Sequence, residues 1–500
     1  MKIFKIAVFL ISLQSTAFAQ KNNYAVIKPT DSEKDIIRIA ANIVPTPRQL
    51  RWQQLELTAF FHFGMNTFTQ REWGDGKEDP KLFNPTKLDA EQWVKTMKDA
   101  GFKQVIITAK HHDGFCLWPT ATTLHSVKSS PWKNGNGDVV KEVSDACKKL
   151  KMGFGIYLSP WDRNAPSYGS EAYNDFFIQQ LTELLTQYGQ VDEVWFDGAN
   201  GEGPNGKKQV YEFERWYDLI RKLQPQATIA IMGPDVRWVG TESGVGRSTE
   251  WNVIPADNLD QAAIADNSQK GVEFKPNFDM QANDLGSREK IFKAKALVWY
   301  PAETDVSIRP GWFYHDKEDS KVKSPKTLND LYFTSVGMNG VLLLNVPPNR
   351  EGRLADADVK NLLDWSKQRN KYFAVNFLKN AVAKSKNGIG LNTMADGNYN
   401  TFFTTRGNDS TTTIEFTLKK SATFDILSLQ ENIQVGQRVE KFAAFYDDKG
   451  TWKKFTEGTT IGYKRLLRFE PITTRKIKIE ISSSRLNPTL SEVGLYKNSF

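Results

Sequence analysis

The chain has 500 residues, of which 40% are hydrophobic and 25% are charged, and its formal net charge is +8. This length exceeds one ordinary hydrophobic core and predicts two or more domains. The positive charge is spread without a dominant Lys/Arg block and without a nucleic-acid-binding motif, so we interpret it as a solvated surface and expect no nucleic-acid partner.

The N-terminal residues have the pattern of a secretory signal. Lys2 and Lys5 precede an apolar run that ends in Ala17-Phe18-Ala19, which predicts a signal peptide over residues 1–19. No Cys follows the expected cleavage point, which argues against a lipoprotein anchor, and no later segment is long and apolar enough for a membrane span. We therefore expect an exported protein, periplasmic or extracellular. Cys116 and Cys147 are expected to be buried free thiols rather than a disulfide.

From residue 57 onward, apolar strand patterns alternate with amphipathic helix patterns. Strands are predicted at 57–64, 104–114, 153–162, 191–200, 228–234, 236–244, 296–308 and 340–352. Helices are predicted at 89–101, 138–153, 170–189, 207–223 and 355–371. Such alternation indicates parallel βαβ units, and about eight of them predict an α/β fold of the TIM type, a (β/α)8-like barrel over residues 20–372. A doubly wound open sheet is the rival, but it would require a Gly-rich phosphate turn after the first strand, where HFGMNTF stands instead.

The pattern changes near Tyr372. Residues 373–500 alternate in the way of β-strands and contain a turn sequence, Asp448-Lys449-Gly450. We predict a C-terminal β-sandwich.

Polar and aromatic residues recur where the predicted barrel strands end, and active sites of such barrels lie at that rim. They are His62, Glu72, Trp73, His111, His112, Tyr157, Trp161, Trp195, Asp197, Arg237, Trp238, Glu242, Glu303, Arg309 and Trp312. Any one of them alone could be structural, and it is their coincidence at one rim that predicts a site.

Asp197 follows an apolar strand and precedes Gly198, a position that suits a nucleophile, a metal ligand or a helix cap. A glycosidase needs a second carboxyl group to protonate the leaving oxygen. The candidates are Glu202, Glu242, Glu250 and Glu303, among which sequence spacing does not choose.

The adjacent His111 and His112 suit either a metal or a sugar, since imidazoles both ligate zinc and hydrogen-bond hydroxyl groups. The first strand reads HFG rather than HxH, and no bridging Lys is present, so we favour a sugar and expect no metal there. A structural alternative is that one histidine is buried and the other exposed.

Three segments together resemble the α-L-fucosidases of glycoside hydrolase family 29, over roughly residues 40–370. They are HFGMNTFTQREWGDG, AKHHDGFCLWPT and VDEVWFDGA. GPDVRWVGTESG and SIRPGWFYH further resemble the subfamily that is selective for α-1,3/1,4-linked fucose on branched glycans.

The resemblance implies a retaining mechanism without a required cofactor. Asp197 matches the nucleophile and Glu242 the acid/base, with Glu250 and Glu303 as rivals for the second role. Retention implies carboxyl groups about 5–5.5 Å apart. The family's fucose-binding positions match His62, Glu72, Trp73, His111, His112 and Tyr157, with Trp73 near the C5-methyl group, and we add Trp195, Arg309 and Trp312 as substrate contacts.

The tail sequence ADGNYNTFFTT resembles a discoidin-type, galactose-binding-like β-sandwich. Phe402 and Phe403 stand where such domains usually carry Trp, so packing against the barrel is as good an expectation as sugar binding. The resemblance also allows a structural calcium ion, although no ligand set is readable.

These observations leave several hypotheses. The first is an exo-fucosidase acting on Lewis a/x-type oligosaccharides or glycoconjugates, and its variant is a broad fucosidase that also takes α-1,2 links. A second class is a metal-dependent hydrolase that uses His111, His112 and Asp197 as ligands. A third is a non-catalytic fucoside-binding protein. The oligomeric state is not predicted.

Overall fold

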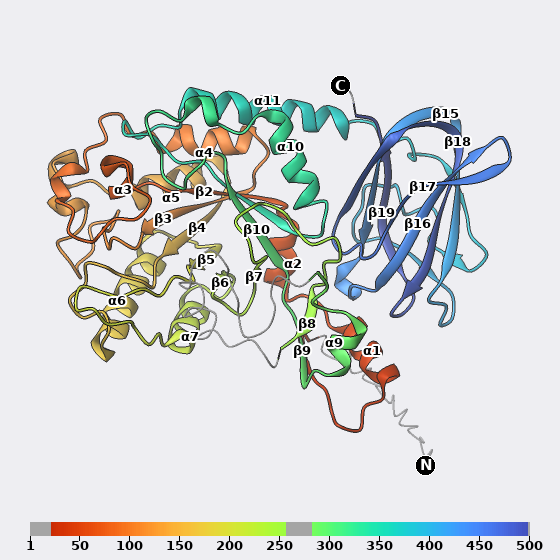
Figure 1. Cartoon of the computed structure of the whole chain (residues 1–500), viewed down its shortest axis with the longest axis horizontal. Coiled ribbons are helices and arrows are strands. Elements are labelled where there is room, and N and C mark those ends of the chain that lie inside the picture. The colour runs from red at the N-terminus through yellow and green to blue at the C-terminus, as the bar shows by residue number, and fades with distance from the viewer. Residues whose placement is uncertain (1–21, 257–282, 499–500) are drawn as a thin grey trace, which may run out of the picture.

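The computed structural model describes residues 22–256 and 283–498. The predicted signal peptide lies outside these residues. Figure 1 shows two bodies side by side, a barrel surrounded by helices and a β-sandwich in blue at the C-terminal end.

The larger body is a nearly closed parallel barrel, as predicted. Its strands are β2 (Leu57–Phe61), β3 (Gln104–Lys110), β4 (Gly153–Leu158), β5 (Glu193–Phe196), β6 (Thr228–Ile231), β7 (Arg237–Trp238), β10 (Ala302–Ser307) and β11 (Val341–Asn345). They lie in the order β6-β5-β4-β3-β2-β11-β10-β7. β2, β3, β10 and β11 are buried at every position, because their two faces contact the barrel interior and the surrounding helices.

The helices of this body are α1 (Glu33–Asn42), α2 (Pro47–Gln53), α3 (Met65–Thr69), α4 (Ala90–Asp99), α5 (Val139–Leu150), α6 (Glu171–Gln187), α7 (Phe213–Leu223), α9 (Arg288–Phe292), α10 (Pro325–Thr334) and α11 (Asp356–Tyr372). Several begin at side-chain caps: Asp89 accepts from Gln92 N at 2.9 Å, and Asp138 accepts from Lys141 N at 2.8 Å. Apolar faces of α4, α5, α6, α7, α10 and α11 pack on the outside of the strands in one large core, whereas α1 and α9 pack in a separate smaller cluster.

The structure corrects three of the predicted elements. Residues 296–308 are two strands, β9 (Ala296–Trp299) and β10, because β9 leaves the barrel and pairs with β1 (Tyr24–Val26) and β8 (Val253–Pro255) in a small antiparallel sheet. Residues 236–244 contain only the two-residue β7, and the rest is a loop. The helix predicted from residue 207 begins at Phe213, and residues 232–236 join β6 to β7 directly.

The smaller body is the predicted β-sandwich. Its strands are β12 (Val382–Lys384), β13 (Gly388–Ile389), β14 (Phe403–Thr405), β15 (Thr412–Glu431), β16 (Val439–Asp448), β17 (Thr451–Gly458), β18 (Arg465–Ser484) and β19 (Thr489–Tyr496). β15 and β18 are each 20 residues long, with register shifts along their pairing where the ladder bends. Lys449 and Gly450 have φ of 53° and 91° and form the predicted turn between β16 and β17.

Phe403 is fully buried in the sandwich's own core rather than packed against the barrel. Cys116 and Cys147 are buried free thiols, as expected. Within the described ranges, no helix is both long enough and apolar enough to cross a membrane.

Candidate active site

Asp197 lies directly after β5, at the rim where the parallel strands end. Its Oδ1 accepts from Ala199 N at 2.7 Å, and the Tyr157 hydroxyl donates to Oδ2 at 3.2 Å. His112 Nε2 lies 3.9 Å from Oδ2. Two hydrogen bonds thus orient this carboxylate, and its side chain is still 27% exposed.

His111 and His112 follow β3, where the pairing with β4 has a register shift between Thr108 and Lys110. An extra residue at such an irregularity re-aims the side chains that follow it. The rings of His111 and His112 are 4.2 Å apart, and the ring of His62, the residue after β2, lies 5.7 Å from that of His111. All three are buried, which rules out the alternative with one exposed histidine.

Burial keeps the three imidazoles neutral at pH 7. It lowers the pKa of His62 to about 3 and that of His111 well below its usual range. For His112, burial outweighs the opposing charge of Asp197, and the pKa is also lowered. A neutral imidazole has one donor and one acceptor nitrogen, which suits sugar hydroxyl groups.

The hydrogen bonds assign the donor nitrogen in two of these rings. Ser159 donates its hydroxyl to Trp161 O at 2.6 Å, so its oxygen accepts from His112 Nδ1 at 2.7 Å. Asn345 Oδ1 accepts from His62 N at 3.2 Å and from His62 Nδ1 at 2.9 Å. The Nε2 atoms of His62 and His112 are therefore acceptors.

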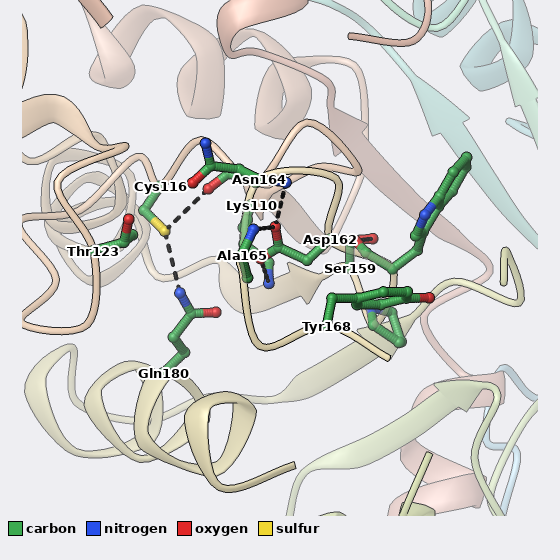
Figure 2. A network of polar contacts seen from close by, with 12 residues as sticks. Lys110, Cys116, Thr123, Ser159, Asp162, Asn164, Ala165, Tyr168 and Gln180 are labelled. Atoms are coloured by element: carbon green, nitrogen blue, oxygen red, sulfur yellow. Dashed lines mark hydrogen bonds and ion pairs between the residues drawn. The ribbon is translucent and has the colours of Figure 1, made fainter. Parts of the chain in front are cut away.

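A buried ion pair supports the strand end that carries the histidines (Figure 2). Lys110 Nζ donates to Asp162 Oδ2 at 2.9 Å, and both side chains are almost fully buried. Asp162 Oδ1 accepts from Asn164 N at 2.9 Å and Ala165 N at 2.8 Å, and Arg163 N donates to His112 O at 2.9 Å. The loop after β4 is thereby joined to the end of β3.

Glu242 lies in the loop after β7 and comes close to the same rim. Trp312 Nε1 donates to Glu242 Oε2 at 3.3 Å. Glu242 is exposed overall, but partial desolvation of its carboxyl group, followed by the negative charge of Asp197, raises its pKa. The two carboxyl groups singled out in the sequence therefore interact across one site.

Glu72 and Trp73 come from the loop after β2. Glu72 Oε2 accepts from Trp312 N at 2.7 Å, and its Oε1 lies 2.8 Å from His315 Nε2. Trp73 is 54% exposed and contacts the rings of Trp161 and His112 edge-on, at 5.6 and 5.8 Å. Trp73 thus offers an aromatic surface at the mouth of the site.

Comparison with known proteins shows the family to which the chain belongs. The family model for α-L-fucosidase matches residues 42–372, and that for the F5/8 type C domain matches residues 379–492. The chain belongs to the α-L-fucosidases of glycoside hydrolase family 29. It is 41% identical to Alpha-L-fucosidase 1 of Arabidopsis thaliana over 469 residues, which cover 91% of this chain and 88% of that one.

Solved structures agree with this family. A Bacteroides ovatus protein described as a candidate α-L-fucosidase shares 53% identity and a TM-score of 0.84, covering 96% of this chain and 78% of its own. A Ruminococcus gnavus family 29 fucosidase, solved in complex with fucose, shares 35% identity and a TM-score of 0.78, covering 91% of this chain and 95% of its own. The protein is therefore a glycoside hydrolase of the α-L-fucosidase type.

Two substrate-contact candidates lie outside the histidine cluster of this fucosidase. Trp195 stacks on Tyr157 at 5.1 Å and donates from Nε1 to Glu303 at 2.7 Å, inside the barrel. The Arg309 guanidinium is buried and pairs with Asp358 at 2.9 Å and Asp319 at 2.7 Å. The Arg309 guanidinium therefore pairs with two acidic groups of the protein itself, Asp319 in the loop after β10 and Asp358 on α11.

The two rivals of Glu242 have different surroundings. Glu250 is buried between Arg237 and Arg247. Glu303 is buried in the barrel interior, where burial and the charge of Glu193 raise its pKa well above the usual range.

Asp305, which the sequence reasoning missed, also belongs to this region. Its Oδ1 accepts from Trp238 Nε1 at 2.7 Å, and burial together with the charge of Glu242 raises its pKa well above the usual range. The alternation of Glu303, Asp305 and Ser307 along β10 could have revealed it, because alternate residues of a barrel strand face the same side.

No cluster of three or more His, Cys, Asp or Glu side chains suited to a metal occurs among residues 22–256 and 283–498. The sandwich does bring Asp396 and Glu492 together, and burial and the negative charge of Asp396 raise the pKa of Glu492 to about 7. Asp396 Oδ2 accepts from Thr401 Oγ1 at 2.8 Å, and Oε1 of Glu492 is buried without a hydrogen bond to any described residue. Two carboxylates and a hydroxyl group fit a hard cation such as calcium, which prefers oxygen ligands.

Proposed function

We propose that this α-L-fucosidase is a retaining exo-enzyme that removes terminal α-1,3/1,4-linked L-fucose from branched glycans of the Lewis a/x type. The observation that carries the proposal is that the negative charge of Asp197 raises the pKa of Glu242 beside three neutral, buried histidines. One partly exposed carboxylate and a second whose pKa is raised are the pair that a retaining glycosidase needs.

Asp197 is the proposed nucleophile. It attacks the anomeric carbon and forms a covalent fucosyl-enzyme as the bond to the leaving oxygen breaks. Its Oδ1 is oriented by Ala199 N and its Oδ2 by Tyr157, so the carboxylate has little freedom to turn away. Orientation of this kind lowers the entropic part of the barrier.

Glu242 is the proposed acid/base. It gives its proton to the departing glycosidic oxygen and then accepts one from the water that hydrolyses the fucosyl-enzyme. Glu250 is a weaker candidate because it is buried and its carboxylate is occupied by ion pairs with Arg237 and Arg247. Glu303 is a weaker candidate because Trp195 and the barrel wall enclose it.

The histidines are the proposed fucose-binding groups. The acceptor Nε2 atoms of His62 and His112 suit hydroxyl groups that donate. Trp73 provides an apolar face for the C5-methyl group. The loops that carry Glu242 and Trp312 meet at the rim, where they would contact the sugars beyond fucose, and this supports a choice of linkage.

The proposal is tested by fucose release from Lewis a trisaccharide, Lewis x trisaccharide, 2′-fucosyllactose and an aryl α-L-fucoside. Fast release from the two Lewis sugars and much slower release from 2′-fucosyllactose and the aryl fucoside is the expected result. Strong release from 2′-fucosyllactose and the aryl fucoside would favour a broad fucosidase. Retention is tested by NMR, since the first product must be the α-anomer of fucose.

Export and calcium binding are further parts of the proposal. Export is supported by the signal pattern of residues 1–19, and it predicts that the mature chain isolated from its producing cells begins at Gln20 by mass spectrometry. Calcium is supported by Asp396, Thr401 and Glu492, which would supply oxygen ligands for a structural ion away from the catalytic rim.

A further inference from the structure

The β-sandwich contacts the barrel through buried polar side chains close to the loop of Glu242. Glu250 N donates to Thr460 Oγ1 at 3.0 Å, and Gln437 Nε2 donates to Glu250 O at 2.8 Å. Gln437 Oε1 also accepts from Asn252 N at 2.8 Å. Thr460 and Gln437 are 1% and 0% exposed. Two side chains of the sandwich thus bind the backbone of residues 250–252 in the barrel.

The side chain of Glu250 links this contact to the neighbouring segment 237–247. Its carboxylate pairs with Arg237, which lies on β7, and with Arg247 at 3.1 Å. Arg247 Nη2 donates to Val239 O at 2.8 Å. Both ends of the segment 237–247, which carries Glu242, are therefore tied to one buried carboxylate. Displacing one partner of such a buried network leaves charges without compensation.

The middle of the same segment is bound to the barrel. Gly244 N donates to Asp305 O at 3.0 Å, and Gly246 N donates to Thr334 O at 2.6 Å. β10 and α10 thereby fix the centre of the loop, and the pairing of β7 with β10 fixes its first residues. The Glu250 cluster joins both ends, and the end at Arg247 is the one next to the sandwich, where Thr459 and Arg465 also donate to Ser248 O.

We infer that the β-sandwich is part of the catalytic framework, and that Thr460 and Gln437 are positioning residues. They hold the loop of Glu242 in place through Glu250. The inference rests on the proposed role of Glu242 as the acid/base. A separate sugar-binding module would not need buried side chains on this segment, whereas an acid that must meet one oxygen is sensitive to small displacements.

The test compares two leaving groups in the same variant, Thr460→Val combined with Gln437→Leu. A sugar leaving group in Lewis x trisaccharide needs protonation, whereas the leaving group of 2,4-dinitrophenyl α-L-fucoside does not. We expect the ratio of kcat/KM for the trisaccharide to kcat/KM for the aryl fucoside to fall about tenfold or more, because general acid catalysis contributes about 10²–10⁴-fold. This ratio does not depend on the fraction of folded protein.

Two controls make the result specific. Thr460→Ser keeps the hydroxyl group and should retain the parent ratio. Arg288→Ala removes a different contact between the two bodies, the ion pair with Glu440 at 2.6 Å, and should also retain it. A fall of the ratio in Arg288→Ala would contradict the inference, because any loosening of the two bodies would then suffice.

Glu242→Ala tests the acid/base role of Glu242 separately from the positioning role of Thr460 and Gln437. If it lowers the ratio and the double variant does not, the positioning role is overturned and the acid/base role stands. If Glu242→Ala leaves the ratio unchanged, the proposed acid/base role fails, and the positioning role fails with it.

Discussion

The indole of Trp312 donates to the carboxyl group of Glu242 at 3.3 Å, and this contact joins the loop after β10 to the loop after β7. The backbone N of Trp312 also donates to Glu72, on the loop after β2. Three loops that are distant in sequence are therefore joined at one side of the site. The arrangement makes Trp312 a link between a proposed sugar-binding carboxylate and the proposed acid.

Trp312→Phe should slow hydrolysis and shift its pH dependence. The hydrogen bond from Trp312 lowers the pKa of Glu242, so its loss should raise that pKa and move the alkaline limb of kcat/KM to higher pH. The loss of one hydrogen bond of about 1 kcal/mol should lower kcat/KM about fivefold. Trp118→Phe removes a similar bond, to Glu183 at 2.7 Å, and should leave the profile unchanged.

Asp197→Ala should abolish turnover while the fold is retained. Loss of the nucleophile in a covalent mechanism lowers kcat by at least about 10³-fold. Azide can enter the space left by the carboxylate, so we expect it to restore reaction with an activated aryl fucoside and to yield β-fucosyl azide. A variant that still turns over without azide would contradict the nucleophile role.

Glu193→Gln should stabilise the protein at high pH. Glu193 is buried at the opposite end of the barrel interior, and burial raises its pKa from 4.5 to about 8. Between these values the folded chain holds a proton that the unfolded chain has released, so stability falls as pH rises through this window. Because glutamine does not ionise, the Glu193→Gln variant should not lose folding stability as pH rises through this window.

The measurement is Tm at pH 5 and at pH 8.5. Relative to the parent, Glu193→Gln should gain about 2 °C or more at pH 8.5 and little or nothing at pH 5. Glu91→Gln changes the same formal charge on the surface, where it pairs with Lys149, and should show no such gain. A gain of equal size at both pH values would contradict the ionisation argument.

Removal of calcium should lower the stability of the sandwich. A ligand that binds only the folded state raises Tm with its concentration, so added Ca²⁺ should raise Tm and a chelator should lower it. Asp396→Asn should lose this response, and the surface variant Asp364→Asn should keep it. If Asp396→Asn shows the same Tm response to Ca²⁺ as the parent, the ion binds elsewhere or binds only nonspecifically.

The sequence by itself determined the fold class and most candidate residues. Alternating strand and helix patterns predict a parallel barrel, and the strand ends then identify the rim that carries His62, His111, Tyr157 and Asp197. These predictions succeed because strand periodicity and strand polarity are local properties of the chain.

The tertiary structure decided what depends on contacts between distant segments. Residues 296–308 read as one strand, but β9 pairs with β1 outside the barrel, and that pairing is invisible to a local pattern. Spacing could not separate Glu242 from Glu250, because their loops fold back in space. Glu250 pairs with two arginines, while Glu242 lies within the field of Asp197. Charge and burial distinguish the two, and only the folded chain brings the relevant groups together.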